Sequence, residues 1–145
     1  MFKHILLPTD GSETSLRAVQ KGADLAKVLG AEVTVMTAIE HFPAGIVGGA
    51  YRPDAQVLNN APQQAANERL EVAEQLVKAA GVTTCHRILS QEHTVYQSIL
   101  AAANTAGADL IVMGTHGMGA LERMLVGSQT QRVLAHTKLP VLTLH

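Results

Sequence analysis

Short apolar runs alternate with segments of helical periodicity along the chain, and this alternation constrains the fold more than any other feature of the sequence. The runs have strand length, are rich in β-branched residues and are bounded mostly by Gly or Pro. They cover residues 5–7, 33–37, 83–89, 110–113 and 141–144. Strands that alternate with helices are typical of a parallel sheet covered by helices on both faces. The sequence therefore predicts an α/β fold with five strands.

Four helices are expected between these runs. They cover residues 12–30, 62–81, 94–106 and 128–136; Ser12 opens the first and Gly30 closes it, and Gly107 ends the third. Pro62 suits the first turn of the second helix, and Gly81 suits its left-handed cap. Residues 41–60 contain two prolines and three glycines, so we interpret them as a long connection near a site or an interface.

Charge and composition exclude several classes of function. Eleven Lys and Arg stand against twelve Asp and Glu, and the basic residues are scattered singly, which argues against nucleic-acid binding. No apolar run approaches the roughly 18 residues that span a bilayer, and no secretory pattern opens the chain. We therefore expect a cytoplasmic protein without membrane insertion, and the single cysteine, Cys85, fits that compartment. With 47% hydrophobic residues, residues 1–145 are expected to form one domain.

A glycine-rich segment follows the fourth predicted strand. It contains Gly114, Gly117 and Gly127, and Ser128 then opens the fourth predicted helix. Glycine lets backbone N–H groups approach an anion, and a helix N-terminus adds further donors and a partial positive charge. Phosphate is the natural ligand of such a segment. The alternative interpretation is that these glycines only form a turn and cap a helix.

A second polar segment, residues 8–12, follows the first predicted strand. In an open parallel sheet, ligands bind beyond the carboxyl ends of the strands, where the strand order reverses. If the first and fourth strands are neighbours at that reversal, Asp10 faces the glycine-rich segment across one crevice. Its carboxylate can then accept hydrogen bonds from ribose hydroxyls or an adenine amine. Asp10 is equally suited to the start of the first helix, and both roles can hold together.

The glycine spacing of residues 114–128 resembles the nucleotide-binding signature of the universal stress protein family, G-x2-G-x9-G followed by Ser or Thr. Residues 5–12 resemble the opening strand and turn of that family, and residues 139–142 resemble its closing strand. The resemblance implies an adenine nucleotide α-hydrolase-like fold, an open five-stranded parallel sheet of order 3-2-1-4-5. It also implies ATP, or AMP or ADP, bound in the crevice with nucleotide-borne Mg²⁺, and a homodimer formed through the last strand.

The resemblance also implies a set of nucleotide-binding residues. The set is Pro8, Thr9, Asp10, Ala38, Met113, Gly114, Gly117, Gly127, Ser128 and Gln129. Thr9 and Asp10 match residues that line the adenosine, and Ala38 matches a small apolar contact of the adenine. Residues 113–117 match the phosphate loop, and residues 127–129 match the donors that close on the phosphates.

The same segments lack the residues of several nucleotide enzymes. Val126 stands before Gly127 with no adjacent lysine, which excludes a P-loop hydrolase. The seven histidines show no metal-ligand spacing, and no residue is nominated as catalytic. His116 and Arg123 are candidates for phosphate contact, or else a loop histidine and a surface arginine. Two functions stay open: an ATP-binding stress-response module that signals its nucleotide occupancy to an unidentified protein partner, and a slow ATP hydrolase using the same crevice.

Overall fold

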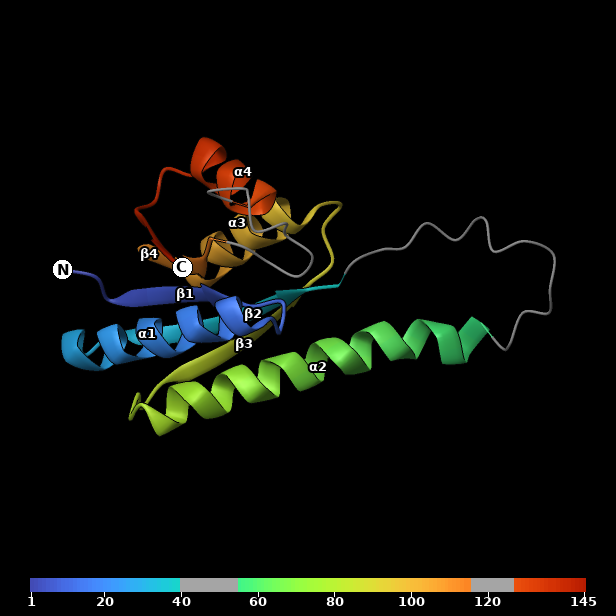
Figure 1. The fold of residues 1–145 in the computed structure, drawn as a ribbon, viewed down its shortest axis with the longest axis horizontal. Coiled ribbons are helices and arrows are strands. Elements are labelled where there is room, and N and C mark those ends of the chain that lie inside the picture. The colour runs from blue at the N-terminus through green and yellow to red at the C-terminus, as the bar shows by residue number, and fades with distance from the viewer. Residues whose placement is uncertain (40–54, 116–126) are drawn as a thin grey trace.

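A computed structural model describes residues 1–39, 55–115 and 127–145. The elements are β1 (His4–Pro8), α1 (Glu13–Leu29), β2 (Glu32–Ala38), α2 (Ala55–Ala79), β3 (Cys85–Ser90), α3 (Val95–Ala106), β4 (Leu110–Gly114), α4 (Ser128–His136) and β5 (Val141–Leu144). The five strands form one parallel sheet of order β3-β2-β1-β4-β5. Helices α1 and α2 pack on one face of the sheet, and α3 and α4 pack on the other (Figure 1). The predicted fold class and strand order are confirmed.

The central strand β1 illustrates why the sheet is buried on both faces. Ile5 and Leu7 face α1 and α2, whereas Leu6 faces α3, and all three side chains are fully buried. Successive side chains of a strand point to opposite faces, so a strand covered on both faces must be apolar at every position. The short continuous apolar runs of the sequence therefore reflect a sheet between two helical layers.

The ends of α1 follow the predicted capping signals. Ser12 lies in extended backbone before the helix, and its side chain accepts a hydrogen bond from the backbone N–H of Ser15. Gly30 adopts the left-handed conformation at φ 65°, where a residue without Cβ is favoured. Gly107 ends α3 in the same way at φ 64°.

The predicted start of the second helix was wrong. Helix α2 begins at Ala55, so Pro62 lies inside the helix rather than in its first turn. Residues 55–60, expected in a connection, are helical, while residues 40–54 lie outside the described part of the chain. No glycine interrupts residues 55–61, and Asn60, Ala61 and Gln63 around Pro62 are exposed. The hydrogen bond that proline removes is therefore lost where water can reach the backbone.

The strand order places the reversal of the sheet at β1. This strand pairs with β2 on one side and with β4 on the other. Because all the strands are parallel, the carboxyl ends of β1, β2 and β4 lie along one edge of the sheet. None of the helices within the described ranges combines the length and apolarity of a membrane crossing.

Candidate functional site

The turn after β1 is held by a buried threonine. The backbone N–H of Thr9 donates to the carbonyl of Met36 on β2, at 2.8 Å. The Thr9 hydroxyl lies 2.9 Å from the Ser15 hydroxyl and accepts a hydrogen bond from the backbone N–H of Gly11. The Thr37 hydroxyl donates to the Thr9 carbonyl at 2.7 Å. These bonds tie the turn to β2 and α1, so they fix the backbone that carries Asp10.

Asp10 itself is partly buried and takes part in the entry to α1. Its Oδ1 accepts a hydrogen bond from the backbone N–H of Ser12 at 2.9 Å. Because Ser12 is the cap of α1, the structural role predicted for Asp10 at the helix start is present in the structure. A carboxylate has several acceptor positions, so this bond is compatible with a ligand contact at the same group.

Gly114, at the carboxyl end of β4, packs closely against α1. A Cβ added there would lie 3.0 Å from Cγ2 of Thr14 and 3.2 Å from the carbonyl oxygen of Thr14. The Gly114 carbonyl accepts a hydrogen bond from the buried Thr130 hydroxyl at 3.0 Å. Met113, beside it, is buried in the core under α3 and α4. Gly114 thus contacts both helical layers, with Thr14 of α1 against its Cα and Thr130 of α4 bonded to its carbonyl.

The N-terminus of α4 lies at this same edge. Gly127 donates its backbone N–H to the carbonyl of Thr115, directly after β4, and precedes the first residue of the helix. Ser128 is exposed, and Oε1 of Gln129 accepts a hydrogen bond from the backbone N–H of Tyr96 at 3.2 Å. The first N–H groups of a helix are left without intrahelical partners, and they carry a partial positive charge. An anion at the end of β4 would find these donors in place.

The remaining predicted residues divide into two groups. Pro8 is buried at the end of β1, and Ala38 is half-buried at the end of β2. Both therefore lie at the carboxyl edge with Asp10. Gly117, His116 and Arg123 fall outside the described residues.

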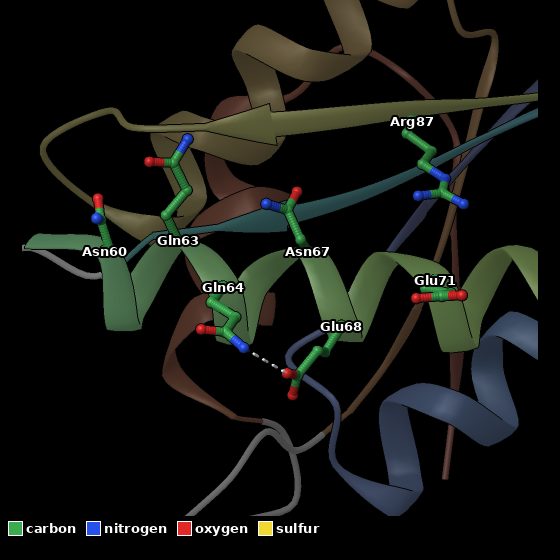
Figure 2. A pocket seen from close by; sticks show the side chains of 7 residues that line it. All are labelled: Asn60, Gln63, Gln64, Asn67, Glu68, Glu71 and Arg87. Carbon is green, nitrogen blue, oxygen red and sulfur yellow. Dashed lines mark hydrogen bonds between the residues drawn. The ribbon is translucent and has the colours of Figure 1, made fainter. Parts of the chain in front are cut away.

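A hollow of about 490 Å³ lies elsewhere, along α2 and β3 (Figure 2). It is lined by Asn60, Gln63, Gln64, Asn67, Glu68, Glu71 and Arg87. None of the predicted site residues lines this hollow, and its two glutamates would repel phosphate. We therefore assign the candidate site to the carboxyl edge rather than to the hollow.

Sequence reasoning missed the hydroxyl groups that hold the candidate site together. Ser15, Thr37 and Thr130 are buried, and each bonds to a turn or strand end at the carboxyl edge. For Thr37 the available signal was a hydroxyl inside an apolar run, because a buried hydroxyl needs a partner; Ser15 and Thr130 lie in helices and carried no such signal. Across the described ranges, no group of three His, Cys, Asp or Glu is arranged to hold a metal ion.

Comparisons with known proteins agree with the observed fold. The model of the universal stress protein family matches residues 1–145. A universal stress protein of Thermus aquaticus is 37% identical, over 98% of this chain and 98% of its own length. Universal stress protein MJ0531 of Methanocaldococcus jannaschii is 32% identical, over 98% of this chain and 81% of its own length. A solved universal stress protein in complex with cAMP is 27% identical with a TM-score of 0.74, covering 99% of this chain and 97% of that one.

Proposed function

The chain belongs to the universal stress protein family, and from this membership we propose that it is a stress-response module that binds an adenine nucleotide at the carboxyl edge of its sheet. One observation carries the proposal. The pairing of β1 with β4 brings the Asp10 turn and the N-terminus of α4 to the same edge, at the reversal of strand order. The similar protein solved with cAMP supports an adenine nucleotide as the ligand class.

ATP is the nucleotide that we propose, with AMP or ADP as the alternatives. In this arrangement Thr9 and Asp10 hold the adenosine, and Ala38 packs against the adenine. Met113, Gly114 and Gly117 border the phosphates, whose charge is met by the N–H groups of residues 127–129. Any Mg²⁺ would arrive with the nucleotide, since phosphate oxygens supply its preferred ligands.

We propose that occupancy of the site is the signal, rather than turnover of the nucleotide. Fast phosphoryl transfer needs charge neutralisation at the transferring group and a positioned nucleophile. Backbone amides at a helix N-terminus bind the ground state about as well as the transition state, which gives affinity without rate. The slow hydrolase remains the second candidate, and turnover on the order of 1 per second or faster would favour it.

A homodimer formed through β5 is part of the proposal. This strand is the last of the sheet and pairs with β4 alone among the described strands. Leu142 is 41% exposed, and an edge strand leaves backbone groups able to pair with a second copy. Light scattering at micromolar concentration is expected to give the mass of two chains, and the mass of one chain would contradict this pairing.

The expected place of action is the cytoplasm, where a partner protein would respond to the nucleotide-bound form. Residues 1–145 are proposed to act there as one domain. Cell fractionation with an antibody to the native chain would check the compartment, and recovery in a secreted fraction would contradict it.

Thermal unfolding with and without nucleotide tests the proposed ligand. At a concentration about 100 times the dissociation constant, ATP should add about 2.7 kcal/mol to the free energy of unfolding. The measurement is a melting curve with millimolar ATP and Mg²⁺, repeated with adenosine and with GTP. An unchanged melting temperature with every adenine ligand would refute the proposal.

Gly117→Val is the matching variant, because a side chain in the phosphate loop should block the ligand while the core stays folded. Its control is Gly107→Asn, at the opposite edge of the sheet, where Asn tolerates the left-handed conformation. We expect the ATP-induced shift to disappear in the first variant and to persist in the second. A retained shift in Gly117→Val would mean that this glycine serves only the turn.

A further inference from the structure

One arginine of α2 reaches the turn that follows β1. A Cβ added at Gly11 would lie 3.1 Å from Cγ, 3.4 Å from Cδ and 3.5 Å from Nε of Arg69. Gly11 has a φ of 81°, so its backbone already favours glycine. The missing side chain also leaves room for the stem of Arg69 to lie across the turn at Gly11, the residue after Asp10.

The guanidinium of Arg69 differs from the other cations along α2 and β3. Arg87 and Lys78 both form ion pairs with Glu74. Arg69 is half-buried, yet within the part of the chain that the structure describes its guanidinium has neither an ion-pair partner nor a hydrogen-bond acceptor. A guanidinium carries five N–H donors and a flat face, so this group is available to a ligand at the carboxyl edge.

The position of Arg69 determines which part of a bound nucleotide its side chain can contact. Arg69 approaches the edge from the face covered by α1 and α2, whereas α4 lies on the opposite face (Figure 1). The phosphates are assigned to the N-terminus of α4, and the adenosine is assigned to Thr9 and Asp10. The Gly11 turn adjoins the adenosine end.

We propose that Arg69 binds the adenine base, with its guanidinium plane packed against the ring. The inference rests on the proposed function and adds to it a base-binding residue outside the strand ends and the glycine-rich segment. Arginine planes stack on nucleobases, and the contact combines cation–π attraction with flat packing. Arg69 thereby contributes to affinity for every ligand with an adenine base, whatever its number of phosphates.

Isothermal titration calorimetry of adenosine, AMP and ATP tests the proposal. Arg69→Ala should weaken the binding of all three ligands by the same factor, about 5- to 30-fold. Arg69→Lys keeps the charge but loses the plane, so it should recover little of the affinity. Arg17→Ala, which removes an exposed arginine of α1, is the matched control and should leave all three affinities unchanged.

The outcomes separate this inference from the proposed function. If the native chain binds none of the three ligands, both are overturned. If the native chain binds and Arg69→Ala binds equally well, the inference alone fails. Weakening confined to AMP and ATP, or full recovery by Arg69→Lys, would make Arg69 a charge contact and would also overturn base stacking. Ligand-free melting curves of each variant establish that the variants are folded.

Discussion

The two edges of the sheet carry different chemistry. At the carboxyl edge, hydroxyl groups hold the turns by hydrogen bonds, and Gly114 packs closely against Thr14. The residue before α4 is hydrogen-bonded to the residue after β4. At the amino edge, ionisable groups engage one another or the backbone. Asp109 accepts hydrogen bonds from the backbone N–H groups of Lys3 and His4, at 2.8 and 3.0 Å.

A second cluster at the amino edge joins three neighbouring strands. Oε2 of Glu32 lies 3.9 Å from Nδ1 of His4 and 3.7 Å from Nε2 of His86. Nε2 of His4 lies 2.7 Å from the Thr34 hydroxyl. Each of these side chains thus has a neighbour of complementary chemistry within the protein, which is typical of an edge with a structural role.

The helix direction explains why the edges differ. In a parallel sheet with connecting helices, every helix begins at the carboxyl edge and ends at the amino edge. Partial positive charge therefore gathers at the first edge and partial negative charge at the second. Anions are therefore favoured at the carboxyl edge, whereas the carboxylates of the amino edge, Asp109 and Glu32, need the neighbouring N–H groups and imidazoles that they have. The comparison predicts that changes at the carboxyl edge affect ligand affinity, whereas changes at the amino edge affect stability alone.

Gly114→Val should have the largest effect. The added side chain meets the side chain and backbone of Thr14, so we expect a loss of about 1–3 kcal/mol in the free energy of unfolding. ATP affinity should fall as well, because the end of β4, to which Thr130 of α4 is bonded, would shift away from Thr14 and the Asp10 turn. Urea unfolding and calorimetry measure the two quantities. A folded variant with native ATP affinity would contradict the predicted dependence of ligand affinity on the carboxyl edge.

Thr9→Val should have the next largest effect. The exchange keeps the shape but removes the acceptor of the Gly11 N–H and the partner of the Ser15 hydroxyl, costing about 1–2 kcal/mol. Affinity for adenosine should fall with it, since the Asp10 turn loosens. Thr83→Val, at an exposed position beyond α2, is the control and should change neither quantity. Loss of stability with unchanged affinity for adenosine would show that the turn does not contribute to ligand binding.

Asp109→Asn should lower stability by about 1 kcal/mol at neutral pH and leave ATP affinity unchanged. Burial tends to raise the pKa of Asp109, but the N–H groups of Lys3 and His4 outweigh it and hold the pKa below its ordinary value of 3.8. A lowered pKa stabilises the fold above the unfolded value, and this contribution is lost as pH falls through the folded pKa.

The stability difference between the native chain and Asp109→Asn should therefore shrink below about pH 4. Urea unfolding from pH 7 to pH 3 measures it. A stability difference that stays constant with pH would show that the ionised carboxylate of Asp109 does not stabilise the amino edge.

Glu32→Gln should have the smallest effect. The Glu32 side chain is 54% exposed, and exposed ion pairs contribute about 0–1 kcal/mol. Melting temperature and ATP affinity should both stay close to those of the native chain. A marked fall in affinity would show that the two edges are coupled, against the division proposed here.

Several features of the molecule could be predicted without the structure because they depend on neighbours in the chain. The apolar runs indicated five strands buried on both faces, and Ser12 and Gly30 marked the ends of α1. The order of the strands came from the family resemblance rather than from the runs. The helix start predicted from Pro62 was wrong, because a local rule on proline takes no account of a helix whose residues around the proline are exposed to solvent.

Other features depend on strands and helices that meet only after folding. The glycine of β4 was predicted for its approach to phosphate, and in the structure it lies in close contact with Thr14 of α1. The histidines have no informative spacing in the sequence, yet β1, β2 and β3 bring His4, Glu32 and His86 together.

The sequence by itself determined the alternation of strands and helices, the helix caps and the residues at the strand ends, because periodicity and capping act over a few residues. Only the tertiary structure decided that Arg69 lies against Gly11 and that two clusters close the amino edge. The physical reason is that side-chain contacts between distant segments depend on the register of the strands and the packing of the helices, which a linear pattern does not specify.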